Sequence, residues 1–520
     1  MLRILILFVF LLPIAANAAD IYIDPDWSGT ESGTFAEPYD SWADVTFVAG
    51  NSYRQKCGST FAGVIYVDVT GTVVNPIVLS AYYDDGGAVH EEDSPNFGQV
   101  CGNAAAKPII NATGQNASAI TIGVGIDYVT IHSLSPRNAV YAGGSQYDGV
   151  KIRDNQNNSI LYCYIYNNAY GVRSYGSNAT IKFNQIDNND ATDEDGQGVD
   201  GVMITKDNCV VSYNWVTGYD HQGIFMIAEG AYTASYTLVE HNYVFGDGNG
   251  HEDAGISTNY DTTANVIRWN YIKNTANGIQ IQGGTNHKVY GNVIDRRQSV
   301  NPSTNSGGIQ VRGLADSPIT GGYFGRNTIF SMDSDPSLNG IRIYTNAGNA
   351  VIENNTFEYN VIQEVADDCI SIVDNGGVVG TNYFTGNICY EYDGTYARID
   401  ASYENLATFN AHAWATGNLD ADPGMTDPDN FDYTASSGSS NMVDAGGDQS
   451  GEDWDTGLLT ANWTTMAFTY ALGSENTNAD AGAFEFGDEY VIEPILYPAV
   501  QKSSYGPDIQ KSDYGAGVQR

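Results

Sequence analysis

One short pattern recurs between about residues 120 and 395, and it limits the possible folds more than any other feature. The pattern is a glycine, a β-branched residue, any residue and a second β-branched residue, followed after a gap by an asparagine, any residue and an apolar residue. Its first half occurs, for example, at residues 149–152 and 278–281, and its second half at residues 242–244 and 292–294. A unit that recurs in this way is typical of a repeat architecture.

The spacing of the repeats indicates their kind. The successive glycines are Gly149, Gly171, Gly201, Gly223, Gly255, Gly278, Gly308 and Gly340, at intervals of 22 to 32 residues. Each interval holds two or three short strands of period two and no amphipathic helix pattern. Strands this short bury their apolar side chains only by stacking on neighbouring repeats. Because parallel crossovers are right-handed, we expect an all-β, right-handed parallel β-helix.

The recurring asparagines are expected to lie in one column of turns. They are Asn184, Asn214, Asn242, Asn270, Asn292, Asn327 and Asn355. A side-chain amide has both donors and an acceptor, so stacked asparagines can hydrogen-bond from coil to coil and satisfy buried polar groups. We interpret this column as structural.

The first residues predict an export signal. Arg3 supplies a positive charge, residues 4–14 an apolar core, and Ala16-Asn17-Ala18 a small-residue cleavage site, so residues 1–18 are interpreted as a signal peptide. No later stretch reaches the roughly 20 apolar residues of a membrane span. We therefore expect a secreted protein that is extracellular, periplasmic or surface-attached, without a transmembrane segment.

Composition suggests how the remaining chain is divided. We expect an N-terminal cap with the first coils over 19–110, β-helix coils over 111–398, an acidic closing segment over 399–490 and a disordered tail over 491–520. The range 399–501 contains no Lys or Arg, and residues 501–506 recur in similar form at residues 510–515. Because solenoid ends require a covering segment, we expect the acidic segment to close the last coil. We expect a monomer.

The charge balance restricts the partners. The chain has 62 Asp and Glu against 22 Lys and Arg, so it lacks the basic surface that nucleic acid binding requires. Eight of the 22 basic residues nevertheless fall between Arg268 and Arg342. A local basic concentration on an acidic protein favours an anionic ligand.

The six cysteines show no zinc-binding spacing. In an oxidising compartment Cys57 with Cys101, or Cys369 with Cys389, could form disulfides. Buried free thiols stacked in the core are an equally open interpretation.

Segments near both ends resemble a known superfamily. Residues 21–25, 33–34 and 37–39 are similar to the opening of secreted pectate-lyase-like β-helix proteins, and residues 442–446 and 480–485 resemble their closing motifs. The resemblance implies the fold. It implies less about chemistry, because the superfamily includes lyases, glycoside hydrolases, epimerases and non-catalytic adhesins.

The residues between the β-branched positions should point outward in each coil. This outward set suggests substrate-binding residues: Gln280, Gln282, Gln310, Arg312, Arg342 and Tyr344. Amides, guanidiniums and a tyrosine suit sugar hydroxyls and carboxylates. The alternative is an ordinary solvated sheet face.

Ionisable residues gather in the turns before three consecutive strands. We expect catalytic residues among Asp200, Asp220, His221, Glu252 and Asp253, and metal ligands at Asp193, Glu194 and Asp195. Carboxylates on neighbouring coils would lie roughly 5 Å apart and those on alternate coils about 10 Å apart, which spans the separations used by retaining and inverting glycosidases. Calcium is the competing use of such oxygen ligands. Solvated turns are the third interpretation.

Two enzyme groups offer a closer comparison. Residues 252–257, followed by residues 278–282, are similar in layout to polysaccharide lyases of the alginate and chondroitin type, but Thr258 or Asn259 stands near the catalytic Lys position and Gln282 near the Arg position. Asp367-Asp368 resembles the aspartate pair of polygalacturonases, although the companion motifs do not follow it.

These features favour a secreted, carbohydrate-active β-helix that cleaves an acidic polysaccharide, as a hydrolase or a lyase. The alternative is a non-catalytic glycan-binding adhesin or tailspike-like module.

Overall fold

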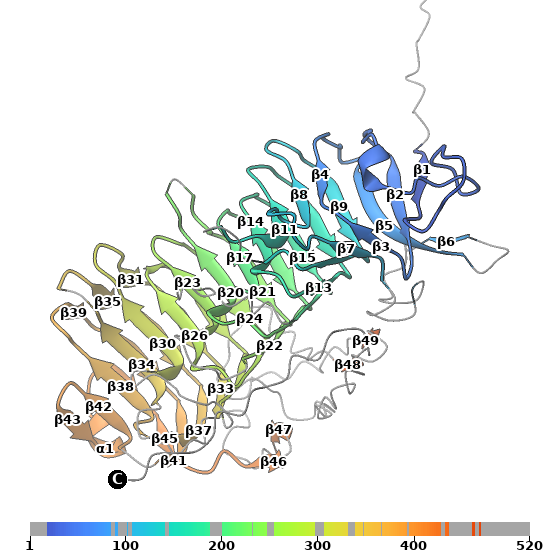
Figure 1. The fold of residues 1–520 in the computed structure, drawn as a ribbon. Helices are drawn as coiled ribbons and strands as arrows, with labels where there is room; N and C mark the ends of the chain where they lie inside the picture. The colour runs from blue at the N-terminus through green and yellow to red at the C-terminus, as the bar shows by residue number, and fades with distance from the viewer. Residues whose placement is uncertain are drawn as a thin grey trace, which may run out of the picture.

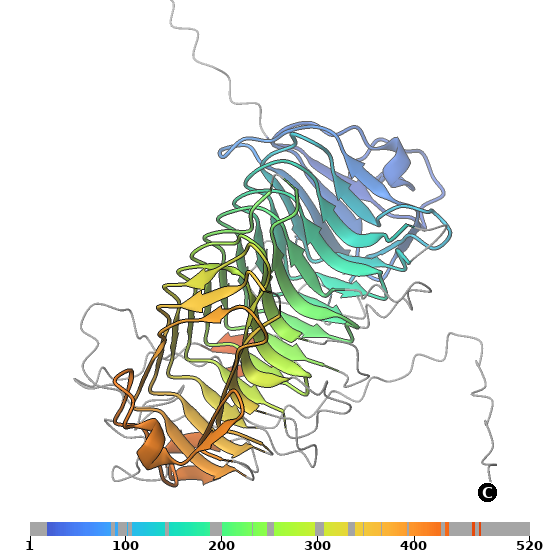
Figure 2. The same ribbon diagram turned by 90° about the vertical axis from the view of Figure 1, so that its left-hand side faces the viewer.

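The computed structural model describes residues 18–427, 432–435, 460–462 and 467–469, except 85–88, 92–100, 102–106, 141–144, 188–199, 231, 247–253, 297–305, 331–338, 347, 366 and 393–394. The chain winds into coils whose strands stack into three long sheets, from the N-terminal to the C-terminal end (Figures 1 and 2). The predicted fold, a right-handed parallel β-helix, is confirmed.

Each coil contributes one short strand to each sheet, and neighbouring strands within a sheet are parallel except at the edges. Sheet A contains β1 (Asp20–Ile23), β2 (Ser52–Lys56), β5 (Ile77–Asp84), β9 (Val129–His132), β12 (Ser159–Leu161), β15 (Thr180–Lys182), β18 (Val210–Ser212), β21 (Leu238–Glu240), β24 (Val266–Arg268), β28 (Lys288–Tyr290), β32 (Tyr323–Gly325), β36 (Thr356–Glu358), β40 (Tyr383–Thr385) and β44 (Ala415–Thr416), with β6 (Val89–Glu91) antiparallel to β5. Sheet B contains β3 (Thr60–Ala62), β7 (Ile109–Asn111), β10 (Ser135–Arg137), β13 (Tyr164–Tyr166), β16 (Gln185–Asp187), β19 (Trp215–Thr217), β22 (Tyr243–Phe245), β25 (Tyr271–Lys273), β29 (Val293–Asp295), β33 (Thr328–Phe330), β37 (Val361–Val365), β41 (Ile388–Tyr392) and β45 (Leu419–Asp420).

Sheet C carries the glycine repeats. It contains β4 (Ile65–Val67), β8 (Ile120–Ile122), β11 (Asp148–Ile152), β14 (Tyr170–Ser174), β17 (Val202–Ile204), β20 (Gln222–Ile227), β23 (Ala254–Asn259), β26 (Asn277–Gln282), β30 (Gly307–Gly313), β34 (Asn339–Thr345), β38 (Ile370–Val373), β42 (Ala397–Ile399) and β43 (Ser402–Glu404). A short sheet D lies between sheets C and A in the later coils and contains β27 (Gly284–Thr285), β31 (Ile319–Thr320), β35 (Val351–Glu353) and β39 (Val378–Val379). Outside the coils lie two antiparallel pairs, β46 (Met425–Asp427) with β47 (Asp432–Ala435) and β48 (Thr460–Asn462) with β49 (Ala467–Thr469).

The core is a stack of aliphatic side chains from all three sheets. In β26, for example, Ile279 and Ile281 are completely buried and pair with Ile309 and Val311 of the next coil. Each coil alone would leave these side chains exposed, so burial of apolar surface between coils stabilises the solenoid.

The repeated glycines are explained by close packing at the start of the sheet C strands. A Cβ atom on Gly278 would lie 2.3 Å from Cγ2 of Ile294 in sheet B and 2.5 Å from the carbonyl oxygen of Gly308 in the next coil. Gly255 and Gly308 meet Ile272 and Ile329 in the same way. Any side chain at these positions would push sheets B and C apart.

The asparagine ladder is confirmed along most of its predicted length. The amide Nδ2 of Asn242 donates to Oδ1 of Asn270 (3.0 Å), and Asn270 donates in turn to Asn292 (3.0 Å). The ladder lies in the turns between sheets A and B and runs through Asn184, Asn214, Asn242, Asn270, Asn292, Asn327, Asn360, Asn387 and Asn418.

The assignment of Asn355 to this ladder was wrong. Asn355 donates instead to Asn382 (2.9 Å), in the turn that joins sheets D and A. The additional strand of sheet D gives the later coils a second asparagine turn, so Asn360 occupies the main ladder there.

Both ends of the coil stack are closed. At the N-terminal end, a 3₁₀ helix (Trp42–Asp44) places Trp42 against the core, where its indole donates to Gln55 (2.7 Å). At the C-terminal end, helix α1 (Leu406–Phe409) is followed by Asn410, whose Oδ1 accepts from the last ladder residue, Asn418 (2.8 Å). The coils extend past residue 398, because β44 and β45 add to sheets A and B.

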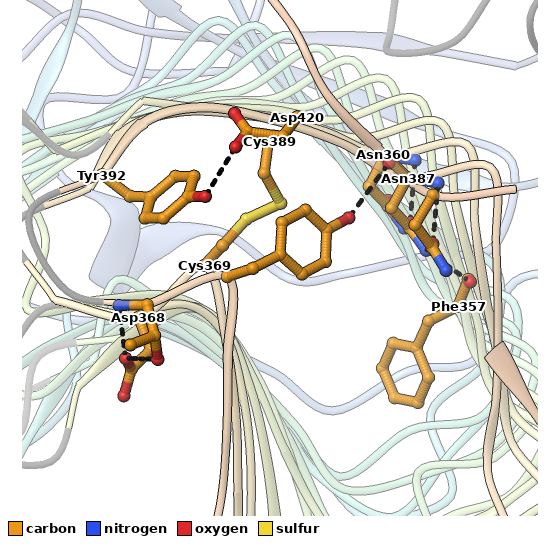
Figure 3. Close-up of a disulfide and its surroundings, with 11 residues drawn as sticks. Phe357, Asn360, Asp368, Cys369, Asn387, Cys389, Tyr392 and Asp420 are labelled. Atoms are coloured by element: carbon orange, nitrogen blue, oxygen red, sulfur yellow. Dashed lines mark hydrogen bonds between the residues drawn. A yellow bond between two sulfur atoms is a disulfide. The ribbon is translucent and has the colours of Figure 1, made fainter. Parts of the chain in front are cut away.

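The cysteines adopt both of the arrangements considered. Cys57 pairs with Cys101 and Cys369 with Cys389 (Figure 3), whereas Cys163 and Cys209 are buried thiols. Among the described residues, no helix has the length and apolar content needed to cross a membrane.

Candidate functional site

The side chains that point outward from sheet C form one continuous column, as the repeat pattern predicts. Its residues pair strand by strand in register: Lys151, Arg173, Met203, Phe225, Ser257, Gln280, Gln310, Arg342, Ser371 and Arg398. We call this set the outer column. Since strands within a sheet lie about 4.8 Å apart, the column presents a regularly spaced row of side chains.

The predicted substrate-binding residues lie together in and beside the outer column. The amide of Gln282 donates to Gln280, and that of Gln280 donates to Gln310. Arg342 lies over the ring of Tyr344, with 4.9 Å from Cζ to the ring centroid, and Arg312 lies 5.9 Å from the same ring. Only Arg312 is half-exposed, and Gln280 and Gln310 are 3% and 2% exposed. Apart from Arg312, these side chains point away from the core of the solenoid but are nevertheless buried from solvent.

A histidine and an aspartate from neighbouring coils meet near the middle of the solenoid. Asp200 directly precedes the turn into β17, and His221 directly precedes β20. Nδ1 of His221 lies 2.9 Å from Oδ1 of Asp200, and the histidine side chain is 33% exposed while the aspartate is buried. We call this pair the dyad. Burial raises the pKa of Asp200, and the hydrogen bond and charge of His221 oppose that rise.

A third side chain lies at the other nitrogen of the imidazole. Nε2 of Gln222 lies 3.4 Å from Nε2 of His221. Donation by this amide goes with the tautomer in which Nδ1 carries the proton and donates it to Asp200.

Cationic and apolar side chains lie beside the dyad. Arg173 forms an ion pair with the fully buried Asp148, with 2.7 Å between Nε and Oδ1, and its guanidinium lies 4.3 Å from the ring centroid of Tyr170. Tyr170, Met203 and Phe225 form an apolar cluster separate from the core, and His221 meets Phe225 edge-on at 5.8 Å between ring centroids. The site therefore combines a hydrogen-bonded histidine and aspartate, an apolar platform and a guanidinium.

Sequence reasoning did not select Arg173 or Tyr170. Gly171 marks the start of that repeat, and the outward position two residues later would have indicated Arg173.

A family model described as "Right handed beta helix region" matches residues 102–251. The chain is a right-handed parallel β-helix protein. The catalytic domain of a GH87 α-1,3-glucanase, solved in complex with tetrasaccharides, is 15% identical with a TM-score of 0.51, and the match covers 71% of this chain and 64% of that chain. An alginate lyase from Paenibacillus sp. str. FPU-7 is 16% identical with a TM-score of 0.43, covering 63% of this chain and 99% of that chain. The pectate lyase Pel9A is 13% identical with a TM-score of 0.39, covering 91% and 97%. Identities this low show the fold alone. A search among curated proteins found no match.

Of the other predicted catalytic residues of this β-helix, only Asp220 lies within the described ranges. Asp220 is half-buried and directly precedes His221. Glu252 and Asp253, as well as the expected calcium ligands Asp193, Glu194 and Asp195, lie outside the described residues. Thr258 points into the core, pairing with Ile281 in register, so of the two residues near the lyase Lys position only Asn259 faces outward.

The aspartates at 367 and 368 have different surroundings. Asp368 is fully buried, and its Oδ1 accepts from the backbone nitrogen of Thr395 (3.0 Å) and from its hydroxyl (2.8 Å), which links two coils (Figure 3). Asp367 is half-buried, and burial together with the charge of Asp368 raises its pKa to about 6 despite the opposing charges of Arg398 and Arg342. Asp368 therefore has a structural role in the β-helix.

One acidic cluster lies far from the dyad in sequence. In the described part of the chain, the one group of ligating atoms suited to a metal is formed by Glu31, Asp40 and Asp44, all exposed, in the N-terminal cap. It shares no residue with the expected calcium ligands, whose use of calcium stays a prediction.

Proposed function

We propose that this β-helix cleaves an acidic polysaccharide that binds along the outer face of sheet C, with the dyad transferring the proton. The observation that carries the proposal is the hydrogen bond between buried Asp200 and half-exposed His221. It fixes the imidazole with Nδ1 toward Asp200, and a substrate that replaces Gln222 as the partner of Nε2 would present its proton to that nitrogen, which then acts as a general base.

The neighbouring residues supply binding groups for such a substrate. Sugar rings have apolar faces that suit Tyr170 and Phe225, and a uronate carboxylate suits Arg173 or Lys151. The regular spacing of the outer column fits a linear polymer rather than a small ligand. The glucanase solved with tetrasaccharides has the same fold, which makes glycans the first ligand class to test.

The same dyad serves either hydrolysis or elimination. In hydrolysis, Nε2 of His221 takes a proton from the attacking water, while a second group, for which the predicted carboxylates Glu252 and Asp253 stay candidates, protonates the glycosidic oxygen as its bond to the sugar carbon breaks. In elimination, Nε2 takes the proton beside the uronate carboxylate, whose charge a guanidinium offsets; a carbon–carbon double bond forms as the carbon–oxygen bond breaks, and the departing oxygen takes a proton from water.

A screen of the purified protein against alginate, polygalacturonate, chondroitin and carrageenan tests the proposal, with absorbance of unsaturated ends and reducing sugar as separate readouts. Unsaturated ends identify a lyase, and reducing sugar alone identifies a hydrolase. We expect His221→Gln and Asp200→Asn to lower the rate by about 10²- to 10⁴-fold, while Lys182→Gln on sheet A leaves it unchanged. Cleavage that persists in both dyad variants contradicts the assignment. Binding without cleavage would establish the glycan-binding adhesin instead.

We further propose that the protein acts outside the cytoplasm. The two disulfides are typical of an oxidising compartment, and the predicted signal peptide lies almost entirely outside the described residues. The intact mass of protein recovered from the culture medium checks this, because removal of residues 1–18 gives a chain that begins at Ala19.

A further inference from the structure

Two arginines flank a serine at the C-terminal end of the outer column. Arg342 in β34 pairs in register with Ser371 in β38, and Ser371 pairs with Arg398 in β42. The two arginines are therefore two strand spacings apart, about 10 Å between their backbones. A group held by both guanidiniums would lie over the short side chain of Ser371.

Arg398 is a cation without a carboxylate partner. It is half-buried, and its Nε donates to the backbone oxygen of Asp400 (3.3 Å). No carboxylate within the described ranges lies at ion-pair distance from it. The sequence interpretation omitted this residue, because only the register of β42 places it in the outer column.

Like charges lie close together at this end of the outer column. Burial lowers the pKa of Arg342, and the positive charge of Arg398 lowers it further, whereas Asp367 and Tyr344 act in the opposite direction. The carboxyl of Asp367 offsets part of the charge of the two guanidiniums, and an anionic ligand would offset more of it.

The serine offers an unused hydrogen-bonding group between the arginines. Ser371 is completely buried, and its Oγ has no hydrogen-bond partner in the part of the chain that the structure describes. Leaving a buried hydroxyl without a partner costs free energy, and an anionic oxygen lying between the two guanidiniums would accept its proton.

We propose that Arg342, Ser371 and Arg398 form an anion-binding cradle for the carboxylate or sulfate group of a polysaccharide. The inference rests on the proposed function for its ligand class and adds a second contact point to it. The cradle is centred on β38, five strand spacings from β20 at the dyad, or about 24 Å. A chain would have to span several sugar residues to occupy both places.

Binding of polymers, measured without cleavage, tests the cradle. The full-length protein carrying His221→Gln is titrated with polygalacturonate as the carboxylate probe, carrageenan as the sulfate probe and dextran as the neutral probe. Arg398→Gln and Arg342→Gln are each expected to weaken binding of one or both polyanions about tenfold and to reduce its dependence on salt. Lys182→Gln removes the same charge from sheet A and is expected to change neither.

The titrations of the variants distinguish a specific anion-binding cradle from a general charge effect. Equal losses in Arg398→Gln and Lys182→Gln would show a general charge effect and overturn the cradle, as would a protein that binds neither polyanion. Because Arg342 is buried, its variant is accepted only if its unfolding temperature matches that of the parent, and the half-exposed Arg398 provides the independent variant. Arg398→Lys keeps the charge and should retain part of the affinity. Failure to cleave any glycan would remove the proposed function but leave this binding result standing.

Discussion

Cys369 lies beside Gly340 of the preceding coil, and its disulfide partner Cys389 lies beside Ile362 of that same preceding coil. In the earlier coil, Gly340 makes room for Cγ2 of Ile362, which would lie 2.4 Å from a Cβ at that position. In the coil that contains β38 and β41, a disulfide between the same two positions replaces this close contact (Figure 3). The disulfide therefore joins sheets B and C where the repeat would otherwise rely on packing alone.

This equivalence predicts that the ordinary repeat pair can replace the disulfide. Cys369→Gly with Cys389→Ile should fold but lose about 3 kcal/mol of unfolding free energy, because the cross-link no longer restricts the unfolded chain. Cys369→Ala with Cys389→Ile differs by one methyl group and should be less stable by a further 1–3 kcal/mol or so, because that methyl meets the isoleucine. Denaturant unfolding of the three proteins measures both differences. Equal stability of the two double variants would contradict the packing account.

The asparagine ladder predicts a large local cost for a small change. Asn270 accepts from the backbone and side chain of Asn242 and donates to Val239, Arg268 and Asn292. Asn270→Ala leaves several of these buried groups without partners, so we expect a loss of about 3 kcal/mol or more. Thermal and denaturant unfolding check this, with the outward-facing Asn259→Ala as the control expected to lose far less.

The fold could be predicted because stacking imposes a period on the sequence. Gly278 must be small beside Ile294, and Asn270 must bond to Asn292, so each constraint returns once per coil. The ladder prediction failed at Asn355 because the strands of sheet D insert a second turn that repeats the same residue type.

The site could be predicted only in part. Asp200 and His221 stand in turns that stacking brings together, so their proximity followed from the coil order. The burial of Gln280 and Gln310 did not, because it depends on what covers the sheet rather than on the strand pattern. Arg398 was missed because Cys369 and Tyr396 stand where earlier repeats have a glycine, and only hydrogen-bond register aligns Arg398 with Arg342.

Polyanion binding at the cradle should depend on pH through Asp367. Its pKa is raised to about 6 by burial and by Asp368, against the charges of Arg398 and Arg342. Below pH 6 the neutral carboxyl no longer offsets the arginines, so binding should tighten as pH falls from 7 to 5, by about fivefold for a contribution of roughly 1 kcal/mol. Carrageenan is the suitable probe because its sulfates keep their charge over this range. The Asp367→Asn variant should bind carrageenan equally at both pH values. If the variant kept the pH dependence of the wild type, this carboxyl would be ruled out as its cause.

The raised pKa of Asp367 also makes the stability of the folded protein depend on pH. Because the folded pKa of Asp367 exceeds its unfolded value, its contribution is fully present below the unfolded pKa and is lost as pH rises through about 6. Asp367→Asn should therefore gain stability relative to wild type at pH 7 and not at pH 3, as read from unfolding temperatures.

Calcium binding by Asp193, Glu194 and Asp195 remains a prediction of the sequence. If calcium binds there, a chelator should lower the unfolding temperature of the wild-type protein, and added calcium should restore it. The triple variant Asp193→Asn, Glu194→Gln, Asp195→Asn should show neither response. A chelator effect that survives in this variant would point to other ligands, of which Glu31, Asp40 and Asp44 are the first to test.

The contact between Asn410 and Asn418 closes the asparagine ladder at its C-terminal end. Every ladder amide donates toward the C-terminal end, so the final one would present an unused donor, and the last strands an open edge, to any second molecule. Asn410 takes that donor, and the antiparallel strand β43 covers β42. A chain lacking residues 402–410 would instead present an unpaired strand β42 and an unused ladder donor at that end to a second molecule.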